Sequence, residues 1–214
     1  MSLPILIYCY DAYCGWCFGF GGVIKNIEEK FAYKLQTETL AGGMITPEKP
    51  VHISVTADYI LNAIPKVEAM TGAKFGSDYL WHLQNPTQTD WFPNSLKPAI
   101  AACIVKEKNP LLQVKFIEAI QFGLFVEGRD LTDDEAYRHL LPLFGFEADD
   151  FYTKLNNKKY LSQALQEFET CKQLRVQGFP ALYLQHTDGK IYAIANGYTS
   201  EKDVESRINK LIHN

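Results

Sequence analysis

The sequence has no cluster of positive charge and no long hydrophobic run. Its 214 residues include 21 Lys and Arg against 25 Asp and Glu, a formal net charge of −4. Because proteins that bind nucleic acid present a basic patch or stripe, no nucleic acid partner is expected. No apolar stretch approaches the roughly 20 residues that span a bilayer, so no membrane partner is expected either.

An export signal is also missing from the start of the sequence. Residues 1–10 are apolar but short, and they lack both a basic beginning and a small-residue cleavage site. We therefore interpret this segment as a buried strand and predict a cytoplasmic protein.

Cysteine and histidine are too few and too scattered for a disulfide-stabilised scaffold or a structural zinc site. Five cysteines, an odd number, do not make a disulfide scaffold in a chain of this length. The five histidines are isolated from one another, and no second C-x-x-C or H-x(3 to 5)-H accompanies the single C-x-x-C. Since a structural zinc needs four ligands, no metal site is predicted.

Hydrophobic patterning in the first 50 residues indicates a strand, a helix and a second strand. Residues 4–10 are rich in Ile, Leu and Tyr, which is typical of a core strand. Residues 19–31 have apolar side chains spaced by three and four, as in a helix with one buried face. Residues 34–41 alternate weakly and end at a pair of glycines. A parallel unit with a right-handed crossover is expected.

The remainder of the chain is predicted to be helical and then to return to strands. Residues 51–174 have helical patterns interrupted at prolines and glycines, and residues 112–125 are the clearest helix. Strands are expected over 181–185 and 191–195, joined by an Asp-Gly hairpin turn. An amphipathic helix over 200–213 ends the sequence, with a serine as its N-cap.

This order of elements predicts an α/β protein, a thioredoxin-like fold interrupted by an all-helical insertion. Residues 1–50 and 170–214 form the thioredoxin-like domain in this interpretation. Residues 51–169 form the helical insertion domain.

The C-x-x-C motif, Cys14-Gly15-Trp16-Cys17, follows the first strand and lies at the start of the first helix. In that context a C-x-x-C is typical of a redox pair. A helix N-terminus presents free N–H groups and partial positive charge, which stabilise a thiolate at Cys14. We expect Cys14 to attack a disulfide and Cys17 to resolve the mixed intermediate.

Other assignments of the cysteines are weaker. Cys9, Cys14 and Cys17 together have the C-x4-C-x2-C spacing of a [2Fe–2S] site, but Cys9 lies inside an apolar run. Two nearby cysteines can also be purely structural. Cys9, Cys103 and Cys171 are most simply small buried hydrophobic residues.

A proline at the entrance to a predicted strand marks a second part of the site. Pro180, preceded by Gly178 and Phe179, cannot donate a hydrogen bond to the sheet and by itself indicates only a turn. Near a C-x-x-C motif it resembles the cis-proline loop of thioredoxin-like proteins. That resemblance implies that the Phe179 backbone pairs with a substrate peptide or glutathione. Gly15, Trp16, Phe179 and Pro180 are the predicted substrate-binding residues.

The whole chain resembles the DsbA family of thioredoxin-like proteins, particularly its cytoplasmic FrnE-like branch. The resemblance implies a thioredoxin domain made from the two ends, a helical domain between them, and thiol chemistry without a bound cofactor. Glutathione is a candidate co-substrate. The matching segments are Asp11-Ala-Tyr-Cys-Gly-Trp-Cys-Phe-Gly-Phe20, Leu40-Ala-Gly-Gly43, Phe125-Val-Glu-Gly-Arg-Asp130 and Gly178-Phe-Pro180.

Two departures from related patterns bear on the chemistry. Exported DsbA proteins resemble one another in a histidine before the second cysteine, where this chain has Trp16, so the direction of electron flow is open. Kappa-type glutathione transferases and hydroxychromene isomerases commonly have serine at the first position, whereas Cys14 is a thiol. Thiol exchange is therefore favoured.

The preferred function is a dithiol oxidoreductase or disulfide isomerase acting on protein or small-molecule thiols and disulfides. Two alternatives stay open: a glutathione-dependent transferase or isomerase of small aromatic molecules, and a redox-responsive adaptor that binds a partner. A homodimer is also a candidate assembly. Asp11 could relay protons, but a turn or capping role is favoured.

Overall fold

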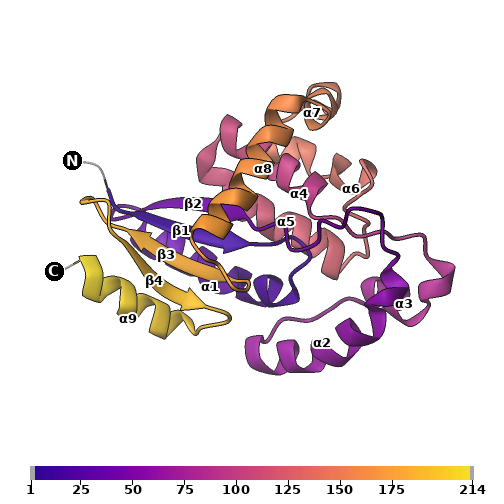
Figure 1. Ribbon diagram of the computed structural model, residues 1–214, viewed down its shortest axis with the longest axis horizontal. Coiled ribbons are helices and arrows are strands. Elements are labelled where there is room, and N and C mark those ends of the chain that lie inside the picture. The colour runs from indigo at the N-terminus through magenta and orange to yellow at the C-terminus, as the bar shows by residue number, and fades with distance from the viewer. Residues whose placement is uncertain (1–2, 213–214) are drawn as a thin grey trace.

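The computed structural model describes residues 3–212, in which a four-stranded sheet lies between helices (Figure 1). The order across the sheet is β2-β1-β3-β4. The strands are β1 (Ile5–Tyr10), β2 (Gln36–Ala41), β3 (Ala181–Gln185) and β4 (Ile191–Asn196). The predicted α/β class and the predicted order of elements along the chain are confirmed.

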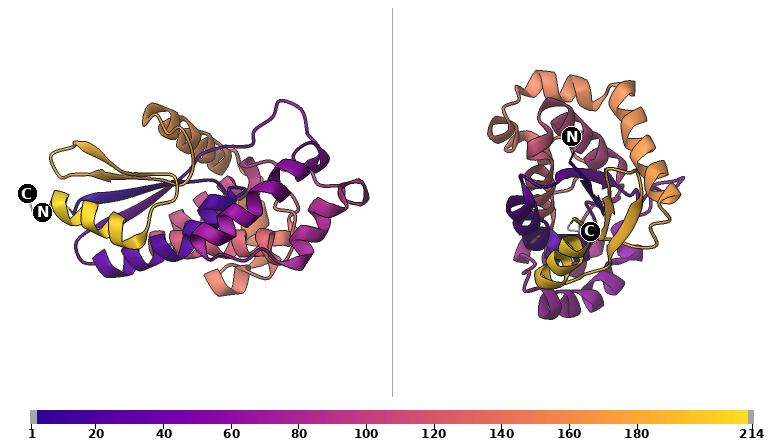
Figure 2. Two further views of the ribbon diagram at one scale, coloured as in Figure 1. Left: turned by 90° about the horizontal axis from the view of Figure 1, so that it is seen from below. Right: turned by 90° about the vertical axis from the view of Figure 1, so that its left-hand side faces the viewer.

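Helices cover both faces of the sheet and form a cluster at one end of it (Figures 1 and 2). The helices α1 and α9 lie on one face and α8 lies on the other. The α-helices are α1 (Gly15–Phe31), α2 (Ala57–Thr71), α3 (Ser77–Gln84), α4 (Leu96–Lys108), α5 (Gln113–Phe125), α6 (Glu135–Arg138), α7 (Ala148–Leu155), α8 (Lys158–Gln173) and α9 (Glu201–Ile212). Four short 3-10 helices are Ile53–Val55, Pro86–Gln88, Pro110–Leu112 and Leu141–Phe144.

The central strand β1 pairs parallel with β2 and antiparallel with β3, and β3 pairs antiparallel with β4. A parallel pair needs a crossover, which α1 supplies. The face of α1 that the apolar spacing predicted is buried, including Phe20, Ile24, Ile27 and Phe31. The sequence therefore predicted this unit correctly.

Strand β1 is buried on both faces, which explains its nearly continuous apolar sequence. Tyr8 and Tyr10 belong to the main core, where Tyr8 packs on Phe20 of α1. Ile7 and Cys9 belong to a smaller apolar cluster on the other face, which also contains Cys171 of α8. Neighbouring residues of one strand thus serve two separate environments.

Side chains from two helices form hydrogen bonds with the backbone groups on the outer edge of β2. Gln113 of α5 accepts a hydrogen bond from the Thr39 N–H at 2.9 Å and donates to the Thr37 carbonyl at 2.6 Å. Glu167 of α8 accepts from the Ala41 N–H at 2.8 Å. An uncovered edge would offer these groups to another chain, so the buried Gln113 and Glu167 protect the sheet.

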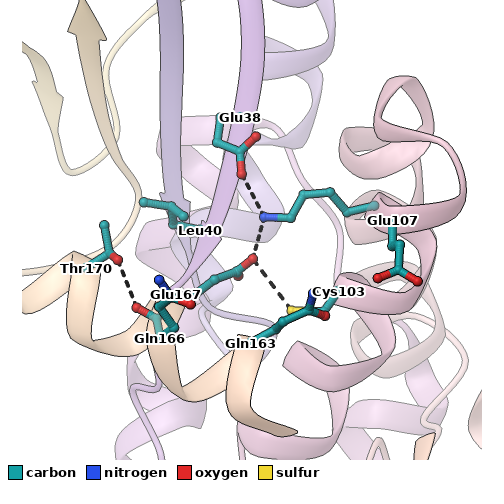
Figure 3. A pocket seen from close by; sticks show the side chains of 9 residues that line it. Glu38, Leu40, Cys103, Glu107, Gln163, Gln166, Glu167 and Thr170 are labelled. Atoms are coloured by element: carbon teal, nitrogen blue, oxygen red, sulfur yellow. Dashed lines mark hydrogen bonds and ion pairs between the residues drawn. The ribbon is translucent and has the colours of Figure 1, made fainter. Parts of the chain in front are cut away.

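An ion-pair cluster extends this edge contact into a pocket of about 380 Å³ (Figure 3). Lys106 of α4 forms ion pairs with Glu38 and Glu167, and it donates to the Thr39 carbonyl at 2.9 Å. Burial raises the pKa of Glu167, and the Lys106 charge opposes that rise. The Lys106 charge therefore offsets the cost of burying the Glu167 carboxylate, which accepts the Ala41 N–H at the edge of the sheet.

The segment predicted to be helical contains α2 to α8, and the helix predicted over 112–125 is confirmed as α5. Pro65 was one of the prolines expected to interrupt the helical pattern, and this expectation is wrong, because α2 continues through it. Pro65 is exposed, so water can bond the carbonyl that the proline leaves without a partner. Buried residues from α1 and α5 share one continuous core. The division into two domains stays a prediction.

The C-terminal elements agree with their predicted turn and cap. Gly189 in the β3–β4 turn has a φ of 84°. The Ser200 hydroxyl accepts from the Asp203 N–H at 3.2 Å, which confirms Ser200 as the N-cap of α9. Residue 213, included in the predicted helix, lies outside the described residues. None of the helices formed by residues 3–212 combines the length and apolar character needed to cross a bilayer.

Candidate active site

Cys14 is the N-cap of α1. Its backbone is extended, with φ −86° and ψ 108°, and its Sγ accepts a hydrogen bond from the Cys17 N–H at 3.3 Å. The helix therefore begins at Gly15, which places the motif at the helix start as expected, four residues before the apolar pattern read from residue 19. Cysteine is not among the usual capping residues, so the apolar spacing gave no signal for this first turn. The N–H donor and the helix N-terminus both stabilise a thiolate on Cys14.

The two thiols of the motif differ in environment. Cys17 is 0% exposed, whereas Cys14 is 5% exposed and lines a cavity that opens to the surface. Burial raises the pKa of Cys17, and its interaction with Cys14 raises that pKa further. Cys14 is therefore the thiol placed for attack, and Cys17 is held protonated behind it.

The loop before β3 meets the dithiol. The Phe179–Pro180 peptide bond is cis, and the Cys14 thiol donates to the Phe179 carbonyl at 3.5 Å. Gly15 and Trp16, in the first turn of α1, line the cavity beside Cys14. The fold thus gathers the predicted catalytic and substrate-binding residues in one place, although their sequence separation reaches 165 positions. Their roles stay predictions.

Two glycines follow β2, and the first of them, Gly42, leaves room for the Phe179 ring. A Cβ atom on Gly42 would lie 1.8 Å from the Phe179 ring, so the ring packs directly on the glycine backbone. At Gly43, with a φ of 64°, a Cβ would lie 2.7 Å from Phe168 of α8. The sequence showed the two glycines as part of a family motif, but the aromatic ring that requires Gly42 is distant in sequence.

Asp11 connects the segments around the site. Its buried carboxylate accepts from the Tyr13 N–H at 3.0 Å, the Met44 N–H at 2.7 Å and the Ser95 hydroxyl at 3.0 Å. Burial raises the pKa of Asp11, and these hydrogen bonds oppose the rise. The turn role favoured from the sequence is the one that these contacts support.

An apolar cavity of about 220 Å³ lies beside Cys14. Tyr13 and Trp16 form one part of its wall, and Tyr59 and Ile64 of α2 form another. Tyr59 is largely exposed at the rim. Aromatic residues near the motif can bind a substrate or pack in the core. The structure divides them, because Phe18 packs on Phe75 and Phe125, and Phe20 packs on Tyr8.

Tyr8 is a residue of the site that sequence patterns did not single out. Its ring is 1% exposed, and among residues 3–212 its hydroxyl has no nitrogen or oxygen partner. Burial raises the pKa of the Tyr8 phenol, and negative charge on Cys17 and Cys14 raises it further. A buried tyrosine in a strand is usually a core residue, so no sequence signal marks this one.

Residues 5–209 match the family described as DSBA-like thioredoxin domain. The chain belongs to this family. The DsbA-like thioredoxin fold with a helical insertion, predicted from the sequence, is thereby confirmed. A comparison with curated protein sequences found no match. Within residues 3–212, no three or more His, Cys, Asp or Glu side chains are grouped so as to hold a metal ion.

Solved structures of the DsbA-like type have the same overall fold. The "putative protein disulfide isomerase" from Nitrosomonas europaea superposes with a TM-score of 0.85 at 23% identity, covering 99% of this chain and 98% of that one. The cytosolic disulfide reductase DsbM from Pseudomonas aeruginosa gives 0.77 at 24% identity, covering 98% of each chain. Its structure with glutathione gives 0.75 at 22%, covering 98% and 100%.

A 2-hydroxychromene-2-carboxylate isomerase is also similar. Its TM-score is 0.66 at 10% identity, and the match covers 97% of this chain and 95% of that one. At such identities these likenesses concern the fold. The DsbA-like family is one of redox enzymes, and in this chain its fold places two thiols of different exposure beside an apolar cavity.

Proposed function

We propose that this DsbA-like protein is a thiol:disulfide oxidoreductase in which Cys14 attacks and Cys17 resolves. The observation that carries the proposal is the placement of Cys14. Its sulfur lies at a helix N-terminus, accepts the Cys17 N–H and contacts the Phe179 carbonyl. Those contacts supply a stabilised nucleophile next to a backbone group that a substrate chain can pair with.

The reaction proceeds in two exchanges. The Cys14 thiolate bonds to one sulfur of a substrate disulfide, and the other sulfur leaves as a thiolate that takes up a proton. The Cys17 thiol then loses its proton and attacks the Cys14 sulfur, which releases the second substrate thiol. The enzyme ends as the Cys14–Cys17 disulfide, and the reverse sequence oxidises a dithiol. The buried Cys17 reacts second because the pKa of its thiol is raised.

Phe179 orients the bound substrate in this proposal. In the reduced protein its carbonyl accepts the Cys14 thiol proton. When Cys14 becomes a thiolate, that carbonyl is free to accept a backbone N–H from an extended peptide or from glutathione. The structure of DsbM with glutathione supports glutathione as a co-substrate.

The apolar cavity selects among substrates. It takes an aliphatic or aromatic side chain next to the substrate cysteine, because its walls are apolar and aromatic. A protein disulfide flanked by such residues therefore fits better than a disulfide flanked by charges. The cytoplasmic location stays a prediction, supported by the similar fold of the cytosolic DsbM. The homodimer also stays a prediction.

Two single substitutions test the mechanism. Cys14→Ser should abolish the reduction of a peptide disulfide, since it removes the attacking sulfur. Cys17→Ser should accumulate a mixed disulfide between Cys14 and the substrate, visible by intact mass. Full activity in Cys14→Ser, or no mixed disulfide in Cys17→Ser, would contradict the assignment.

The reduction potential of the Cys14–Cys17 pair gives the direction of electron flow. Equilibration with glutathione buffers measures it, and a difference of about 30 mV corresponds to about 1.4 kcal/mol. A potential below that of the glutathione pool defines a reductase. A higher potential defines an oxidant or isomerase.

A second candidate is a glutathione-dependent isomerase of small aromatic molecules. The 220 Å³ apolar cavity beside Cys14 favours it, as does the similar fold of the hydroxychromene carboxylate isomerase. Such a reaction needs one glutathione site and no resolving thiol. Isomerase turnover that survives Cys17→Ala would establish this candidate, whereas loss of disulfide exchange in the same variant supports the first.

A further inference from the structure

The pocket along the outer edge of β2 lies apart from the dithiol. It measures about 380 Å³ and is formed by β2, α4 and α8 (Figure 3). Most of its lining side chains are polar or charged, so it differs in chemistry from the apolar cavity beside Cys14. Its volume is that of a site for a small molecule. The groups that its side chains leave free therefore decide which molecule fits.

The donors of Lys106 are already engaged. Its ammonium group donates to Glu38 at 2.8 Å, to the Thr39 carbonyl at 2.9 Å and to Glu167. Because a lysine ammonium has three N–H groups, none of them remains for a ligand. Glu167 is engaged as well, since one of its oxygens accepts from Lys106 and the other from the Ala41 N–H. The pocket therefore has no free lysine donor to offer to an anion.

Two acceptors in the pocket remain open to a ligand. The Glu38 side chain is 43% exposed, and an ionised carboxylate accepts about four hydrogen bonds, of which Lys106 supplies one. The Gln163 Oε1 atom is buried, and among residues 3–212 it has no hydrogen-bond partner. A buried acceptor without a partner costs free energy, which an N–H group of a ligand would offset.

The neighbouring Glu107 fixes the orientation of the Gln163 amide. Hydrogen bonds from Lys159 and Tyr160, and less strongly from Gln163, lower the pKa of Glu107. Only the amide nitrogen of Gln163 can donate, so Nε2 faces the Glu107 carboxylate and Oε1 points away from it. The unpartnered oxygen is therefore a property of this arrangement, which a flipped amide would not relieve.

The charges of the pocket favour a cation. Three carboxylates line it, on Glu38, Glu107 and Glu167, together with the one ammonium group of Lys106. Lys159, which is not part of the lining, also pairs with Glu107, and the carboxylates still outnumber the ammonium groups. Within residues 3–212, these carboxylates are not grouped so as to hold a metal ion. An organic cation with several N–H donors is therefore the ligand that the pocket fits.

We propose that this pocket binds an aliphatic diamine. One ammonium group of the ligand pairs with the Glu38 carboxylate. The other donates to Gln163 Oε1 and lies beside Glu107, because the Gln163 amide adjoins that carboxylate. Leu40 gives the lining an apolar surface for the methylene chain. The site and its ligand are independent of the thiol chemistry proposed for Cys14.

Isothermal titration calorimetry of the full-length protein with 1,5-diaminopentane tests the proposal. Two matched probes are 1,5-pentanediol, which has the same chain without charge, and glutarate, which has the opposite charge. The titrations are made in about 150 mM salt, where attraction between distant exposed charges is screened. We expect one saturable site for the diamine and no binding of the diol or of glutarate.

Substitutions in the lining locate the bound diamine. Glu38→Gln removes the charge that pairs with one ammonium group, and Gln163→Leu removes the unpartnered oxygen. Each should weaken the binding of 1,5-diaminopentane by at least about tenfold, as loss of a hydrogen bond to a charged group does. Glu169→Gln is the matched control, because Glu169 is exposed on α8, pairs with Lys172 and does not line the pocket. Its affinity should stay within about twofold of wild type.

Three results overturn the proposal. Wild-type protein that shows no saturable binding of the diamine has no such site. Equal binding of the diol or of glutarate would show that the pocket does not select a cation. Equal affinities in Glu38→Gln and Glu169→Gln would show diffuse attraction to the acidic surface. Glu38 is partly exposed, so this comparison holds even if Gln163→Leu folds poorly.

Discussion

The two faces of one sheet carry two cysteine pairs with opposite environments. Cys14 and Cys17 lie at a helix N-terminus beside a backbone carbonyl and an open cavity. Cys9 and Cys171 belong to one small apolar cluster and have almost no exposure. The same side chain is thus the proposed nucleophile on one face and a core residue on the other. Helix ends and exposure, and not residue type, make this difference.

The largest expected effect is on the rate of disulfide reduction, from substitution of Cys14. Cys14→Ser should lower the rate of peptide disulfide reduction by at least about 10³-fold, because the reacting sulfur is lost. Cys171→Ala should leave the rate within about twofold, since buried small-residue changes act mainly on stability. A disulfide reduction assay at neutral pH compares them. Equal losses in both variants would remove the distinction between the two pairs.

The next largest effect is expected at Gly42, on which the Phe179 ring packs. Gly42→Ala places a Cβ where the Phe179 ring lies, so the ring must move and substrate binding should weaken. We expect KM for a peptide disulfide to rise by about tenfold or more, and the free energy of unfolding to fall by about 1–3 kcal/mol.

Gly22→Ala is the matched control for this glycine. Gly22 is exposed in α1, and no atom lies within 4 Å of its Cβ position. The change should raise the free energy of unfolding by about 0.5–1 kcal/mol and leave KM unchanged. Similar KM values in the two alanine variants would show that Phe179 does not position substrate.

Tyr8 should have a smaller effect, confined to the resolving step. Its buried phenol has no hydrogen-bond partner within residues 3–212 and is near enough for the charge on Cys17 to raise its pKa, so it can donate to the thiolate that Cys17 forms before it attacks. Tyr8→Phe should lengthen the lifetime of the mixed disulfide about tenfold, as loss of a hydrogen bond to a charged group does. Rapid quenching and intact mass measure that lifetime. Tyr10→Phe, which removes an equally buried hydroxyl, should not change it.

The smallest effect concerns the carboxylate beside the second pair. Burial raises the pKa of Glu167, so the folded protein holds this proton at a pH where the unfolded chain has lost it. The contribution of Glu167 to stability therefore increases as pH falls through the raised pKa. Glu167→Gln removes this linkage, and it should lower the free energy of unfolding by about 1–3 kcal/mol at neutral pH. The difference from wild type should grow toward pH 5.

Denaturant unfolding across that pH range checks the sign for Glu167. A difference that shrinks toward pH 5 would contradict the raised pKa. Disulfide reduction by Glu167→Gln should remain near the wild-type rate, because the residue lies on the opposite face of the sheet from Cys14. A large loss would instead connect the two faces.

Local patterns predicted the elements well. The apolar spacing of α1 and the Asp-Gly turn before β4 reflect contacts that are close in sequence, and both are seen. The apolar spacing alone indicated α1 only from residue 19, because its cap is a cysteine, whereas the context of the C-x-x-C placed the helix start correctly. The break expected at Pro65 failed because an exposed proline can stay within a helix.

The site was only partly visible in the sequence. The C-x-x-C and the proline loop could be found because family resemblance names them. Gly42 is necessary because the Phe179 ring packs on it, and Tyr59 adds a wall to the cavity. Both features depend on contacts between distant segments. Such contacts arise from tertiary packing, and no local pattern encodes them.

The hydrogen bonds that Gln113 and Glu167 make to β2 have a consequence for exchange with solvent. Amides on the outer edge of a sheet normally exchange their hydrogens quickly. Here the Thr39 and Ala41 amides are held by side chains from two helices, so their exchange requires those helices to move away. The amides that exchange slowly in this protein should therefore include those of Thr39 and Ala41 in the edge strand β2. This edge of the sheet should open only when the helices that cover it move away.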